Sequence, residues 1–89
     1  MATLNFTKQS NGFWGADVTA NESFVIQLER SKSGRVIISA SQDSTMGKEI
    51  FFAENRGKSF RQSFSDLVFP LYLHIDSESE VTNGIFLER

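Results

Sequence analysis

Short apolar stretches, each ended by Gly, Asn, Ser or Pro, follow one another along nearly the whole of this chain. Strands bounded by turn residues at intervals of about 8–12 residues are typical of a β-sandwich or barrel. The sequence therefore predicts an all-β, mainly antiparallel fold: a small, jelly-roll-like β-sandwich of about seven or eight strands. A length of 89 residues suits a single domain that spans residues 1–89.

The clearest alternation of apolar and polar residues lies between residues 23 and 41. Phe24, Ile26 and Leu28 point to one side of an extended strand, because successive side chains of a strand point to opposite faces. The polar residues 31–34 then form a turn, and a second alternating stretch follows. The pattern predicts a β-hairpin over residues 23–41.

Two Asn-Gly pairs provide further turn signals. Asn11-Gly12 lies between alternating stretches, and both residues tolerate the positive φ angles of a type I′ turn. This pair predicts a hairpin over residues 3–19. Asn83-Gly84 is a second hairpin signal, near the C-terminus.

One segment, residues 59–68, fits either a strand or a short helix. Its apolar residues follow the spacing of a helix face; they are Phe60, Phe64, Leu67 and Val68. The segment is rich in Ser and Phe, which are mediocre helix formers, and Phe60, Gln62 and Phe64 also share one face of a strand. The alternation alone leaves both possibilities open.

The composition limits the chemistry of the chain. The sequence has no cysteine, which excludes zinc ribbons, iron–sulfur clusters and thiol catalysis and favours a reducing compartment. No signal peptide is visible, so a cytoplasmic or virion-associated location is favoured. The longest apolar stretch, residues 67–73, is far shorter than the roughly 20 residues that span a bilayer, so we expect no membrane partner. Nine Phe, one Trp and one Tyr supply the bulk of a dense small core.

Charge is unevenly distributed along the sequence. The formal net charge of −2 argues against a general nucleic-acid binder. Residues 30–61 contain seven basic and three acidic residues, for a net charge of +4, and residues 62–88 contain five acidic residues and no Lys or Arg, for −5. If each block forms one end of the fold, the molecule has a charge dipole that favours association.

The only histidine, His74, belongs to a strand in which Leu71, Leu73 and Ile75 are expected to face the core. Tyr72, His74 and Asp76 then share the opposite face. His74 is the one sensible acid–base candidate, with Asp76 to orient it, but no nucleophile accompanies it. A solvent-facing polar side of a strand accounts for the same pattern, so we expect no enzyme and no cofactor. The acidic stretch 76–80 lacks the glycine and the final glutamate of a calcium loop.

Two sets of residues are candidates for ligand binding. Aromatic and imidazole rings suit a carbohydrate, and this candidate site comprises Trp14, Tyr72 and His74. Basic residues at two expected hairpin tips, beside Phe60, suit the phosphates of a single-stranded nucleic acid; they are Arg30, Lys32, Arg35, Arg56, Lys58 and Arg61. Gly57-Lys58-Ser59 resembles the end of a phosphate-binding loop, but Phe52 stands where that motif needs a second glycine.

The Ser-Gly turn, the Ser-Gln-Asp-Ser loop and the late Leu-Tyr-Leu-His-Ile strand are similar to small sandwich modules of carbohydrate-binding and phage structural proteins, although no motif identifies a family. We expect a non-enzymatic binding or assembly module that acts through protein–protein contacts, with self-association or another protein as its partner. Carbohydrate binding and single-stranded nucleic-acid binding are the alternatives.

Overall fold

The computed structural model describes residues 2–42 and 49–88, and for residues 49–53, 55 and 56 it describes the backbone alone. This part of the chain forms nine strands: β1 (Ala2–Thr3), β2 (Thr7–Lys8), β3 (Trp14–Ala20), β4 (Phe24–Arg30), β5 (Gly34–Ser41), β6 (Glu49–Arg56), β7 (Ser59–Phe64), β8 (Leu71–Ser77) and β9 (Val81–Glu88). The all-β prediction is confirmed. The Ser-Gln-Asp-Ser loop, residues 41–44, lies partly outside the described residues.

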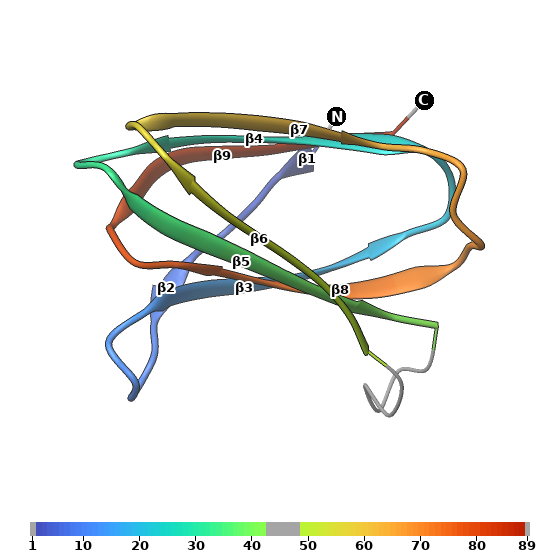
Figure 1. Ribbon diagram of the computed structural model, residues 1–89, viewed down its shortest axis with the longest axis horizontal. Coiled ribbons are helices and arrows are strands. Elements are labelled where there is room, and N and C mark those ends of the chain that lie inside the picture. Colours follow the sequence, from blue (N-terminus) through green and yellow to red (C-terminus); the bar gives the residue numbers. More distant parts are fainter. Residues whose placement is uncertain (1, 43–48, 89) are drawn as a thin grey trace.

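The strands form two packed antiparallel sheets, one above the other in Figure 1. The four-stranded sheet has the order β1-β9-β4-β7, and the five-stranded sheet has the order β2-β3-β8-β5-β6. Without the two-residue edge strand β2, these are the two sheets of an eight-stranded jelly roll. The predicted jelly-roll-like sandwich is therefore confirmed, with short additional pairing at one edge.

The core lies between the sheets, where alternate side chains of each strand point inward. In β4, Phe24, Ile26 and Leu28 are buried, as the alternation of the sequence predicts. The buried hydrophobic residues form one cluster. Phe24 is at its aromatic centre, with its ring stacked on that of Phe64 at 4.8 Å between centroids and 5.3 Å from that of Phe86. Four of the 15 buried hydrophobic residues described are phenylalanines and the other eleven are aliphatic, so aromatic rings supply only part of the core.

The segment 59–68 contains a strand, β7, and no helix. Phe60 and Phe64 both face inward, opposite Leu28 and Phe24 of β4. The strand alternative is confirmed and the helix alternative is wrong, because pairing with β4 buries both phenylalanines on one side of an extended chain. The described residues include no helix that could cross a membrane.

The hairpin predicted over residues 23–41 is wrong. β4 pairs with β7 and β9 in one sheet, whereas β5 pairs with β6 and β8 in the other. The turn after Arg30 therefore carries the chain across the sandwich. Alternation identifies the buried face of each strand, but both a hairpin and a crossing between sheets satisfy the same alternation.

The hairpin predicted over residues 3–19 is shorter in the structure. Only Thr7–Lys8 pairs with β3, since β1 belongs to the other sheet. The turn at Asn11-Gly12 is confirmed, with Gln9 N–H donating to Phe13 O at 2.8 Å and Gly12 N–H donating to Gln9 O at 3.0 Å. Only Gly12 has a positive φ in this turn, at 89°, so the type I′ geometry is wrong.

The second Asn-Gly pair forms no turn, because Asn83 and Gly84 lie inside β9. Gly84 faces the core opposite Leu28, where a Cβ atom would lie 3.0 Å from Phe6 and 3.2 Å from Leu4. The glycine provides room for the N-terminal segment, which crosses between the sheets and is held by Leu4 N–H donating to Gly84 O at 2.9 Å.

Candidate functional site

A connected group of polar side chains lies on the outer face of the five-stranded sheet. Leu71, Leu73 and Ile75 of β8 are buried, so Tyr72, His74 and Asp76 face outward and are half-buried. This arrangement confirms the predicted shared face. His74 pairs in register with Asp17 of β3 on one side and with Ser39 of β5 on the other.

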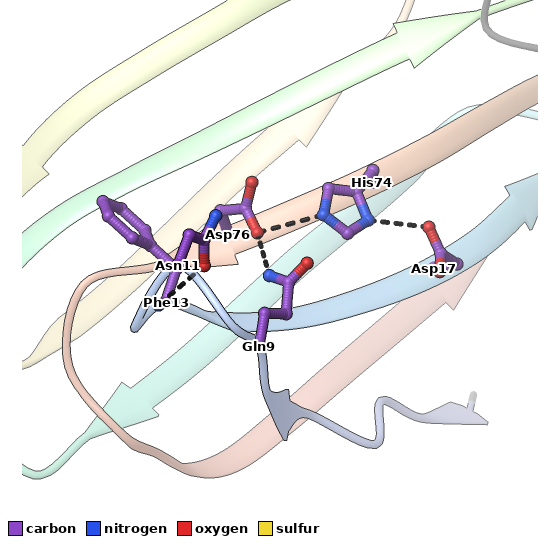
Figure 2. A network of polar contacts seen from close by, with 6 residues as sticks. All are labelled: Gln9, Asn11, Phe13, Asp17, His74 and Asp76. Carbon is purple, nitrogen blue, oxygen red and sulfur yellow. Dashed lines mark hydrogen bonds and ion pairs between the residues drawn. The ribbon is translucent and has the colours of Figure 1, made fainter.

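Both ring nitrogens of His74 contact a carboxylate (Figure 2). Nδ1 lies 2.7 Å from Oδ1 of Asp17, and Nε2 lies 3.0 Å from Oδ1 of Asp76. A neutral imidazole has a single N–H, whereas the imidazolium donates from both nitrogens. The observed contacts therefore suit a protonated ring between two carboxylates.

Gln9 extends this group toward the N-terminal turn. Its Nε2 donates to the same Asp76 oxygen at 2.5 Å, and its side chain lies over Gly15, where a Cβ atom would be 2.6 Å from Cδ of Gln9. A glycine at this position of β3 lets Gln9 cross the strand and reach β8. We call Gln9, Asp17, His74 and Asp76 the His74 network.

The electrostatics of the network follow from its two carboxylates. Burial of the ring lowers the pKa of His74, but the hydrogen bonds and negative charges of Asp17 and Asp76 outweigh it and raise the pKa above its ordinary value. Side-chain exposure differs across the network: 83% for Asp17, 30% for His74 and 20% for Asp76. The contact with Asp76 is the less hydrated of the two.

This geometry favours a structural role for His74 over catalysis. A general base needs a nitrogen lone pair directed at the proton that it removes. Both nitrogens of His74 instead face carboxylates of the protein. Among the described residues no group of three or more His, Asp or Glu is placed to hold a metal ion.

The structure does not bring together the three residues of the predicted carbohydrate site. Tyr72 and His74 are neighbours on the outer face. Trp14 belongs to the inward-facing row of β3, in register with the buried Ser77, and is half-buried. A single sugar-binding surface made of all three rings is therefore inconsistent with the fold.

Arg30 is not at an exposed basic tip, and that prediction is wrong. The residue is 3% exposed and continues the inward row of β4. Its guanidinium donates to Gly34 O at 2.6 Å and to Gly57 O at 2.5 Å. Burial lowers the pKa of Arg30, and the negative charge of Glu78 offsets part of that effect. Arg30 thus holds two backbone segments together.

Arg30 also holds together the basic connections 31–33 and 57–58, at the end of the sandwich that is on the left in Figure 1. Lys32, Arg35 and Lys58 are exposed there. The connection from β8 to β9 meets them, with Glu78 N–H donating to Arg35 O at 2.9 Å and Ser31 N–H donating to Glu80 O at 2.9 Å.

Basic and acidic residues therefore share this end, and the predicted separation of charge into two ends is wrong. Glu78 and Glu80 are both exposed beside the basic segments. Arg61 lies apart on the outer face of the four-stranded sheet, opposite Gln27, and the side chain of Arg56 lies outside the described residues. The described basic side chains form no uniform positive surface for a phosphate chain.

Sequence reasoning missed Asp17 and Gln9. Asp17 alternates with the inward residues of β3, which places it on the outer face, but its pairing with His74 depends on a strand register that no local signal gives. Gly15 was the one signal for Gln9, because a glycine inside a strand marks a close approach.

The chain matches no protein-family model, and searches of curated proteins and of solved structures give no match either.

Proposed function

We propose that this chain is a non-enzymatic assembly module that acts through protein–protein contacts, and that β6 pairs with β6 of a second copy. The observation that carries this proposal is the position of β6 at the edge of the five-stranded sheet. All eight of its residues pair with β5, and no strand of the described chain pairs with its other side. An uncovered edge offers unpaired N–H and C=O groups to another strand.

Two of the other edges carry a charge at their centre, and the fourth edge is formed by the two-residue strand β1. β7 has the exposed Arg61, and the part of β3 that β2 leaves uncovered has the exposed Asp17. Charged side chains at an edge oppose pairing with another chain. β6 instead contains the uncharged apolar run 50–53, Ile-Phe-Phe-Ala, which favours it as the contact.

A second copy suits this edge because antiparallel pairing about a twofold axis brings the same surface of each copy together. An axis at Phe52 sets Phe51 of one copy opposite Ala53 of the other. Glu49 then faces Asn55, and Glu54 faces Ile50. Within residues 49–55 no charge faces a like charge, and like charges directly opposite would destabilise the pair.

The experiment is sedimentation velocity over a range of protein concentrations. We expect the wild-type chain to shift from monomer to dimer as concentration rises. Phe51→Lys, at the β6 position opposite Ser39, should abolish the dimer. Ser63→Lys places the same charge on β7 and is the matched control, so it should dimerise like the wild type. A wild-type chain that stays monomeric at all concentrations would contradict the proposal.

A further inference from the structure

The hydrophobic side chains of β3 that are fully buried are small. They are Ala16 and Ala20, whose burial contributes little compared with a buried Phe or Leu. Trp14 and Val18 on the same face are half-buried. On the edge away from β8, β3 pairs with β2 only at Trp14 and Gly15. β8 therefore supplies nearly all of the backbone pairing of β3.

The contacts on the outer face therefore matter for how firmly β3 stays in place. Asp17 of β3 reaches Nδ1 of His74, and Gln9 of the preceding turn reaches Asp76 of β8. Asp76 also contacts Nε2 of His74. The His74 network joins β3 and the turn before it to β8 with side chains alone.

We propose that Asp17, His74 and Asp76 form a pH-sensitive clamp that fastens β3 to β8 and is closed only while His74 carries its proton. A ring that loses this proton keeps one N–H and turns a lone pair toward the other carboxylate. Asp17 is far better hydrated than Asp76, so the ring retains its N–H for Asp76 and Asp17 turns into the solvent. The cross-strand contact is then lost and β3 opens more often.

The surroundings of His74 leave these two carboxylates in control of its charge. β5 presents Ser39, with the half-buried Ile37 and the buried Ser41 two residues to either side, and none of these titrates in the relevant range. β3 contributes Asp17, and the turn before it contributes the neutral amide of Gln9. On β8 itself the titratable neighbours are Tyr72 and Asp76. The raised pKa of His74 agrees with a ring held in its charged form.

The test is amide hydrogen exchange of β3, expressed as protection factors that remove the intrinsic pH dependence of exchange. From about pH 6 to about pH 8.5, we expect protection of β3 to fall roughly two- to fivefold, as suits a partly exposed ion pair. Protection of β4 should change less. Asp17→Asn and His74→Gln should each remove the pH dependence of β3.

Glu22→Gln is the matched control, because it removes one exposed carboxylate in the turn after β3 and leaves the clamp intact. It should keep the wild-type pH dependence. Asp17 is exposed, so Asp17→Asn provides a folded variant even if His74→Gln does not fold. Equal β3 protection at both pH values in the wild type, or an undiminished pH dependence in Asp17→Asn, would overturn the proposal.

Discussion

The guanidinium of Arg30 donates a hydrogen bond to the carbonyl oxygen of Gly57, 2.5 Å away and 27 residues further along the chain. A second hydrogen bond, to Gly34 O at 2.6 Å, joins the same side chain to the start of β5. Arg30 N–H also donates to Lys58 O at 2.9 Å. One buried side chain thus fixes two crossings between the sheets at the same end of the sandwich.

Replacing Arg30 should therefore destabilise the fold. Arg30→Met keeps much of the side-chain volume but removes its donors, so the carbonyl groups of Gly34 and Gly57 lose their partner. We expect a loss of about 2–4 kcal/mol in the free energy of unfolding, measured by urea denaturation. The exposed Arg35 gives the control, and Arg35→Met should change stability by less than about 0.5 kcal/mol. Equal effects of the two substitutions would contradict the role of Arg30.

Gly15 should tolerate alanine only if Gln9 moves. A Cβ atom at this position would overlap the end of the Gln9 side chain, so Gly15→Ala displaces Gln9 from Asp76. We expect a cost of about 1 kcal/mol from the lost hydrogen bond. The same substitution in a Gln9→Ala background should cost less, because no contact remains to be lost. Additive effects in this double-mutant cycle would show that the two residues are independent.

The pKa of His74 should lie above its ordinary value of about 6.5. Titration of its ring resonances by NMR measures this directly. Asp17→Asn and Asp76→Asn should each lower the midpoint, because each removes a negative charge beside the ring. A midpoint at or below the ordinary value in the wild type would mean that burial outweighs the carboxylates.

The free energy of unfolding should also depend on the protonation of His74. Because the pKa of His74 is higher in the folded than in the unfolded chain, its contribution is fully present below about pH 6.5 and is lost as pH rises through the folded-state pKa. Urea denaturation across this range should show a decline in the wild type. His74→Gln should show a smaller decline, and an unchanged one would exclude His74 as its source.

The aromatic centre of the core should be the most sensitive site in the molecule. Phe24 is 1% exposed and packs on Phe64 and Phe86, with Phe69 at its edge. Phe24→Ala should cost about 3–5 kcal/mol in the free energy of unfolding, a large part of the stability of a small domain. Leu87 is 43% exposed, and Leu87→Ala should cost about 1 kcal/mol or less.

The sequence predicted the faces of strands better than their partners. The alternation of residues 71–76 correctly separated the buried Leu71, Leu73 and Ile75 from the outward His74. The same rule, continued through β4 from Phe24 to Arg30, places Arg30 inward, but its charge led to an exposed assignment. Charge is a weak guide where backbone carbonyl groups are available as acceptors.

Strand partners depend on contacts between distant parts of the chain, which no local pattern contains. The hairpin over residues 23–41 failed for this reason, and so did the turn at Asn83-Gly84, where the glycine serves a close approach of Leu4 and Phe6. Asp17 and His74 meet only because β3 lies next to β8. The pattern of the sequence therefore identified His74 and Asp76 of the candidate site. It did not identify Asp17 of β3 or Gln9 of the turn before it.

The most direct measurement of the assembly proposed for this chain is hydrogen exchange of β6 at low and high protein concentration. Pairing of β6 with its copy would give partners to backbone groups that the described chain leaves uncovered. The account predicts that exchange in β6 slows as concentration rises, while exchange in β7, which has Arg61 at its centre, stays the same. Exchange in β6 that is independent of concentration would contradict it.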